Sequence, residues 1–253
     1  MFYIFSYMQL SIQKMFQEHY VVLFIMYVFI LQGLLAFNLG SSYSTIPPLG
    51  WLLMDVLASV LIGPTLEELR FRSWLPKKGT QLALRQSAWF WAWAIHMVLY
   101  ILPIFFLGRP IFDIGGIVAT PISIAEHTFG VNLTSVSLGI NTLINPVHLN
   151  GLVTFLVTYP IVRLVNKRKA IFVPSNKLWY VVSIISFVPS HFQIIWDFAT
   201  FGSLWLLFIA ANYVVAGIVF SLVYKKHGLK KAIILHGLVN IIAYSSALIR
   251  VLV

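Results

Sequence analysis

The sequence GPTLEELRFRSWLP, residues 63–76, places two adjacent acids and two arginines at the end of an apolar segment of membrane-spanning length. On a helix, Glu68 and Arg72 are four residues apart with the acid on the N-terminal side, the favourable order for an ion pair. Glu67 points about 100° away around the same helix. The stretch therefore predicts one structural acid, Glu68, and one acid, Glu67, placed for chemistry. The alternative is a helix end whose charges reach the lipid headgroups.

The composition indicates a membrane protein. Of 253 residues, 60% are hydrophobic and 9% are charged, and the mean hydropathy is +0.90, so the polar surface that a soluble domain needs is missing. We therefore expect an all-α, polytopic transmembrane helix bundle in one domain. No signal peptide is expected, because the N-terminal region lacks an early positive charge and a cleavage site. The lack of cysteine excludes disulfides, thiolate metal ligands and a cysteine nucleophile.

Hydropathy predicts about seven spans, seven or eight in all, with a cytoplasmic N-terminus. The expected spans are residues 20–38, 51–75, 88–107, 149–164, 178–196, 203–224 and 232–253. Residues 1–17 are apolar but interrupted by polar side chains, which is typical of an interfacial helix. Residues 108–147 contain glycines, prolines and two acids, and we interpret them as an outer loop or a re-entrant segment.

The positive charges lie on one side of this arrangement. Of 17 lysines and arginines, only Arg109 and Arg250 fall toward the side opposite the basic loops. The loops are residues 77–85, 167–177 and 225–231. This asymmetry follows the positive-inside rule and predicts that the loops lie in the cytoplasm. The expected partners of the basic residues are the anionic lipids of a bacterial plasma membrane, and not nucleic acid. The net charge of +10 is thus a topological signal.

Four polar residues fall in the inner half of the bilayer in this topology: Glu67, His191, His236 and Asn240. They come from three different predicted helices, and titratable groups at similar depth on separate helices indicate a shared cavity. His236 and Asn240 are four residues apart and share a helix face. Hydrogen bonding between helices, which only holds a bundle together, is the alternative for this pair.

Together these residues resemble the CPBP family of intramembrane proteases, which includes the CAAX prenyl endopeptidases and bacterial proteins of the abortive-infection type. The family pattern is Glu-Glu-x-x-x-Arg, Phe-x-x-x-His and His-x-x-x-Asn, each on its own helix. Here the first motif is Glu67-Glu68-Leu-Arg-Phe-Arg72, with Ser73 where glycine is frequent, and the last is His236-Gly-Leu-Val-Asn240. The resemblance covers residues 51–243, the expected protease-like core.

The middle motif has two candidates. His191 follows Phe187 at the family spacing and lies 45 residues before His236, but it implies a long insertion after the first motif. His96 lies 29 residues after Glu67, near the usual separation, yet Ala92 replaces the phenylalanine. We favour His191 and keep His96 as the alternative.

The resemblance implies an intramembrane endopeptidase that hydrolyses a peptide bond. Glu67 would activate the attacking water, the middle histidine would assist, and His236 with Asn240 would stabilise the oxyanion. Glu68 paired with Arg72 would be structural, as the spacing suggests independently.

The sequence does not decide whether the site binds a metal ion. Glu67, His191 and His236 match in type the three protein ligands of a catalytic zinc site, so a divalent metal such as zinc is one option. No His-Glu-x-x-His helix is present, so the commonest zinc-protease motif is excluded.

The expected substrate and partner is a membrane-associated peptide or protein. Bacterial peptide processing and bacteriocin self-immunity are the roles favoured for so short a chain. The alternative is a catalytically inactive family member that acts as a membrane immunity or regulatory binding protein. A transporter is a weaker reading, because inverted repeats are not apparent.

Overall fold

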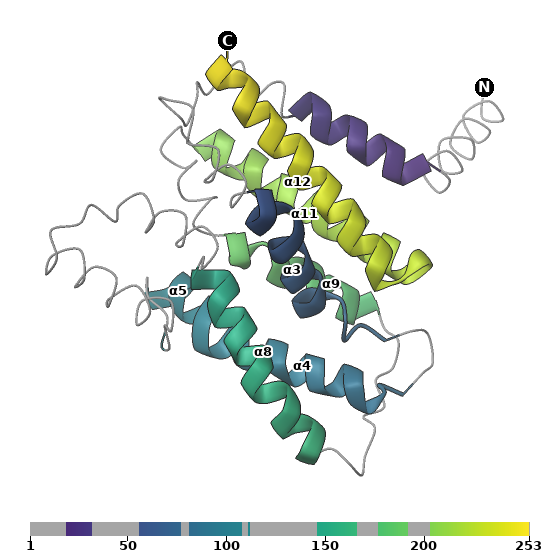
Figure 1. The fold of residues 1–253 in the computed structure, drawn as a ribbon, viewed down its shortest axis with the longest axis vertical. Helices are drawn as coiled ribbons and strands as arrows, with labels where there is room; N and C mark the ends of the chain where they lie inside the picture. The colour runs from purple at the N-terminus through teal and green to yellow at the C-terminus, as the bar shows by residue number, and fades with distance from the viewer. Residues whose placement is uncertain are drawn as a thin grey trace, which may run out of the picture.

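The computed structural model describes residues 19–31, 56–76, 81–107, 111, 146–165, 177–191 and 203–252. The elements of this part of the chain are helices (Figure 1), which confirms the predicted all-α class there. In order, they are the helix His19–Leu31, η1 (Leu57–Ile62), α3 (Gly63–Phe71), α4 (Leu84–His96), η2 (Met97–Ile101), α5 (Leu102–Leu107), α8 (Pro146–Val165), α9 (Lys177–Phe187), η3 (Pro189–His191), α11 (Ser203–His227) and α12 (Leu229–Leu252). The predicted interfacial helix 1–17 and nearly all of segment 108–147 lie outside the described residues.

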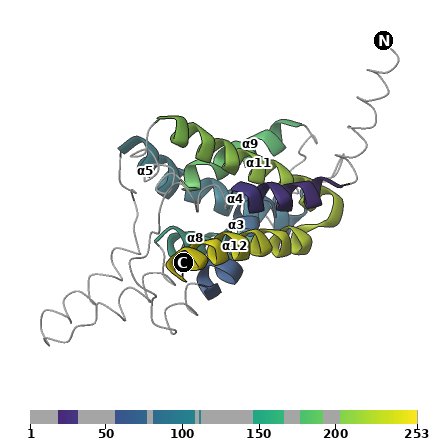
Figure 2. The ribbon, with the colours of Figure 1, turned by 90° about the horizontal axis from the view of Figure 1, so that it is seen from above.

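Helix α3, which carries the charged stretch, lies at the centre of the described part. It contacts α4, α8, α9 and α12, and Figure 1 shows it between the α11–α12 pair and the α4–α8 pair. Helices α9 and α11 are also in contact and lie side by side in the view from above (Figure 2). The acids and arginines of α3 are therefore surrounded by other helices.

The second predicted span, residues 51–75, is not one continuous α-helix to its end. Its described part begins with the π-helix η1, and α3 ends at Phe71. In the last turn of α3, the Arg70 carbonyl accepts a hydrogen bond from the Trp74 indole at 2.9 Å. Pro76 follows, and proline is common just beyond a helix end because it cannot continue the helix.

The fifth predicted span, residues 178–196, is not one continuous α-helix within its described part, which ends at His191. Helix α9 ends at Phe187 and the chain tightens into the 3₁₀ turn η3. Pro189 supplies no N–H to continue the α-helical pattern and disfavours an α conformation at Val188. Helix α9 therefore ends before His191.

The described part both buries charged groups and exposes large apolar side chains. Glu68, Arg70 and Arg72 are fully buried, whereas Phe29 is 67% exposed and Val165 is 77% exposed. Large apolar side chains are exposed on every long helix, while the buried acids and arginines lie within a core that is mostly apolar. Exposed apolar surface on this scale marks an interaction surface, of which a lipid environment is one kind.

One described stretch, Leu207–His227 of α11, has the length and composition to cross a membrane. The apolar helices His19–Leu31 and Val153–Val165 are shorter. The arrangement of about seven spans stays a prediction.

Candidate active site

Three elements bring Glu67, His191 and His236 together. The Oε2 atom of Glu67 on α3 lies 3.4 Å from Nε2 of His191 on η3 and 3.8 Å from Nε2 of His236 on α12. The side chains of Glu67 and His191 are 11% and 12% exposed and that of His236 is 5% exposed, and the Oε2 atom of Glu67 is itself buried. The clustering that the sequence predicted for these three residues is present.

The position of His191 follows from the end of α9. Because the 3₁₀ turn pairs the His191 amide with the Val188 carbonyl, the Phe187 carbonyl is left for side chains. It lies 2.9 Å from Nδ1 of His191 and also accepts the Ser190 hydroxyl. Donation from Nδ1–H to this carbonyl directs Nε2 toward Glu67.

His236 is positioned by the acid that the sequence analysis called structural. Its Nδ1 lies 2.9 Å from Oε1 of Glu68, and the same oxygen accepts from Nη1 of Arg72 at 2.8 Å. The predicted Glu68–Arg72 ion pair is thus confirmed, with both side chains fully buried. Glu68 also fixes the ring of His236, which presents Nε2 to Glu67. The link between Glu68 and His236 was missed, because they are 168 residues apart.

A second buried arginine accompanies the acids. Arg70 is fully buried, its guanidinium lies 5.6 Å from the Phe71 ring centroid, and it interacts electrostatically with Glu67. Together with Arg72 it provides two positive charges beside the two acids. Buried charges persist when they are compensated in this way. The sequence analysis noted Arg70 but gave it no role.

Asn240 lies one turn after His236 and holds the π-helix in place. Its Nδ2 donates to the Ser59 carbonyl at 2.7 Å. In a π-helix the Ser59 carbonyl would pair with the N–H of residue 64, and Pro64 has none. Asn240 therefore supplies the hydrogen bond that Pro64 cannot. The predicted oxyanion role would use the second N–H of the same amide.

Aromatic rings from α11 support both histidines. Tyr213 stacks on His191 with ring centroids 4.2 Å apart, and Phe220 stacks on His236 at 4.4 Å. Between them on the helix, Gly217 has its carbonyl 3.5 Å from Nη2 of Arg72. The sequence analysis missed this face of α11. The available signal was the spacing of Tyr213, Gly217 and Phe220, which places them on one side of a helix.

His96, the alternative middle histidine, packs against aromatic side chains of η2 and α8. It is fully buried on α4 and stacks on Tyr100, with ring centroids 5.3 Å apart. Phe155 of α8 lies beside it at 6.5 Å. The choice of His191 stays a prediction, and the ring nitrogen 3.4 Å from Glu67 supports it.

The residues do not fit the metal option as they are arranged. Among the described residues, no three histidine, aspartate or glutamate side chains form a group that could hold a metal ion. We therefore derive no step through a metal.

No protein-family model, curated protein or solved structure matches this chain. A function is therefore inferred from the chain's own residues. The relevant arrangement is a largely buried carboxylate, that of Glu67, faced by two imidazoles, with the fully buried carboxylate of Glu68 beside it. Chemically, such a site can remove a proton from water and donate hydrogen bonds to a developing oxyanion.

Proposed function

We propose that this protein is an intramembrane endopeptidase of the CPBP type, which hydrolyses a peptide bond in a membrane-associated peptide. The observation that carries the proposal is the position of Glu67 Oε2, 3.4 Å and 3.8 Å from Nε2 atoms of two histidines on separate elements. Neither histidine is near Glu67 in the sequence, so the fold assembles the group.

In the proposed reaction, Glu67 takes a proton from water as the oxygen attacks the peptide carbonyl. The carbonyl π electrons move to oxygen, giving a tetrahedral oxyanion. His236, protonated on both nitrogens, donates through Nδ1 to Glu68 and through Nε2 to this oxyanion. When the C–N bond breaks, the proton held by Glu67 passes to the leaving amine, with His191 as the adjacent relay. Water is consumed, and an acid and an amine form.

The membrane placement is part of the proposal. The exposed apolar surface supports it, because the apolar residues exposed on α8, α11 and the helix His19–Leu31 suit lipid contact. Hydrocarbon around the bundle also raises the cost of the buried acids and arginines, which fits a site kept for chemistry. We place the basic loops in the cytoplasm, and we take the substrate to be a peptide that reaches the site from the bilayer, in bacterial peptide processing or bacteriocin self-immunity.

The alternative of an inactive immunity or regulatory protein is distinguished by a comparison of cells. Cells that produce the parent protein or its Glu67→Gln variant at equal levels are compared for membrane and secreted peptides by mass spectrometry. The proposal expects peptides that appear only with the parent. As a control, His227→Ala, at the exposed end of α11, should give the parent pattern. Identical peptide sets with both proteins would instead favour the binding role.

A further inference from the structure

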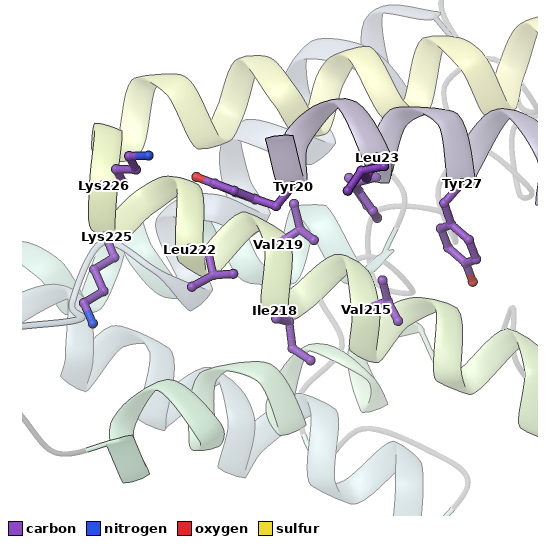
Figure 3. Close-up of a pocket in the computed structure, with 10 residues that line it drawn as sticks. Tyr20, Leu23, Tyr27, Val215, Ile218, Val219, Leu222, Lys225 and Lys226 are labelled. Carbon is purple, nitrogen blue, oxygen red and sulfur yellow. The ribbon is translucent and has the colours of Figure 1, made fainter. Parts of the chain in front are cut away.

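A groove separate from Glu67 runs between the helix His19–Leu31 and α11. It has a volume of about 850 Å³, and Figure 3 shows side chains from both helices facing it. Its middle is apolar, and its lining residues are Tyr20, Leu23, Phe24, Tyr27, Val215, Ile218, Val219, Leu222, Lys225 and Lys226. A soluble polar ligand has almost no partners along most of this groove.

Most of the polar groups of the groove lie at one end, and Tyr27 lies toward the other (Figure 3). Lys225 and Lys226 close this end, and both are exposed in the last turn of α11. Tyr20 lies beside them, with Nζ of Lys226 5.9 Å from its ring centroid, and its hydroxyl points toward Lys226 (Figure 3). That hydroxyl is buried and has no hydrogen-bond partner in the described part of the chain.

We propose that this groove binds an anionic phospholipid. One acyl chain lies along the apolar wall formed by residues such as Phe24 and Val219, and the phosphate lies at the end with Lys225, Lys226 and the Tyr20 hydroxyl. Charge complementarity favours an anionic headgroup, because basic residues at the cytoplasmic surface attract anionic lipids. The apolar length excludes a free phosphate as the full ligand. The inference rests on the proposed membrane placement but not on the proposed catalysis.

The first test measures headgroup selectivity. The purified full chain in neutral detergent is titrated with short-chain phosphatidylglycerol, with phosphatidylcholine of the same chains, and with inorganic phosphate, and native mass spectrometry reads the bound lipid. We expect phosphatidylglycerol to bind more tightly than phosphatidylcholine, by about 25-fold if each lysine contributes about fivefold. Equal binding of the two lipids, or saturation by inorganic phosphate alone, would overturn the proposal.

The lysines have a matched control pair. Lys225→Gln/Lys226→Gln should reduce phosphatidylglycerol binding to the phosphatidylcholine level. Lys230→Gln/Lys231→Gln removes the same charge from exposed positions at the start of α12, outside the groove lining, and should keep the selectivity. Equal losses in both variants would show that general surface charge attracts the lipid, which contradicts the groove assignment.

The apolar part is tested by filling it. Ile218→Trp should lower binding of both lipids by about tenfold, because an indole occupies the chain position. Ile234→Trp places the same side chain on an exposed position of α12 and should bind as the parent does. Unchanged binding in Ile218→Trp would mean that the chain lies elsewhere. These experiments measure lipid binding and not peptide cleavage, so Glu67→Gln should bind lipid as the parent does. A failure of the lipid-binding proposal can therefore be told apart from a failure of the protease proposal.

Discussion

At the scale of single residues, Glu67 and Glu68 differ in what each carboxylate touches. Glu68 is sealed between Arg72 and His236, at 2.8 Å and 2.9 Å, whereas Glu67 keeps some exposure and faces two imidazole Nε2 atoms. Adjacent positions on one helix point in different directions, which allows neighbouring acids to have different surroundings. The same chemical group can therefore be structural in one position and reactive in the next.

The first prediction separates these acids. Glu67→Gln should abolish cleavage and leave the thermal unfolding temperature unchanged. Glu68→Gln should also lower stability by about 3–5 kcal/mol, because it leaves Arg72 buried without its charge partner. Turnover and thermal unfolding of the two purified variants provide the check. Equal stability with equal loss of activity would contradict the division of roles.

The second prediction concerns the histidines. His191→Ala should reduce turnover by at least about a hundredfold, as expected for a group that assists proton transfer. His96→Ala, which removes a ring stacked on Tyr100, should cost less than about tenfold in turnover. Initial rates of both variants at equal folded concentration provide the measurement. A larger loss of turnover in His96→Ala than in His191→Ala would assign the middle motif to His96.

The sequence could predict contacts between residues close in the chain, such as Glu68 with Arg72, because helical geometry alone brings them together. It predicted that Glu67, His191 and His236 would gather, from their residue types and expected depth. It could not predict that Glu68 holds His236, since this contact depends on how α12 packs on α3. The stacking of Tyr213 and Phe220 on the histidines depends on packing in the same way.

At the scale of elements, the junction of η1 and α3 with α12 depends on Pro64 and Asn240. Hydropathy predicted one helix here, because it carries no information on hydrogen-bond register. The π-helix leaves the Ser59 carbonyl for Asn240, and the close approach of α12 depends on Gly237. Helices that approach closely in membranes favour small residues at the contact.

A double-mutant cycle tests the first of these contacts. Asn240→Leu should destabilise the fold by about 1–3 kcal/mol, because the partly buried Ser59 carbonyl loses its donor. Pro64→Ala restores a backbone N–H at that position, so the double variant should lose less stability than the two single losses added together. Thermal or denaturant unfolding of all four proteins gives the coupling. Strict additivity would show that Pro64 and Asn240 do not serve the same carbonyl.

The glycine contact gives a further prediction. A Cβ at Gly237 would lie 2.7 Å from the Val60 carbonyl oxygen, so Gly237→Ala should push α12 away from η1 and lower both stability and turnover. The matched change Gly217→Ala meets the Ile184 side chain at 3.4 Å, an ordinary contact, and should be better tolerated. The unfolding temperatures of the two variants provide the measurement. Equal unfolding temperatures would contradict the claim that the contact between α12 and η1 requires a glycine at position 237.

At the scale of the whole molecule, the described part buries two acids and two arginines within a mostly apolar core and exposes many large apolar side chains. Composition predicted this class of protein, and the helical part of that prediction is confirmed for the described residues. The number of spans stays a prediction, and apolar runs in the sequence do not show where a helix tightens or stops. Helix α9, which ends at Phe187, is the clearest case.

The proposed membrane arrangement predicts the location of added tags. Tags after Lys169 and Lys226 should be cytoplasmic and a tag near Leu133 external, because the basic loops are retained inside. Labelling of intact cells with an impermeant reagent, compared with lysed cells, measures this. External labelling after both lysines would show that the topology is the reverse of the predicted one. The basic end of the groove would then not face the cytoplasmic lipid leaflet.

The central claim is that Glu67 activates water against a peptide bond. The most direct measurement is hydrolysis of the identified peptide by the purified protein in ¹⁸O-labelled water, with mass analysis of the new carboxyl terminus. The parent should form a product carrying ¹⁸O from the solvent, and Glu67→Gln should form none while retaining the parent's unfolding temperature. Cleavage by Glu67→Gln at the parent's rate would contradict the account.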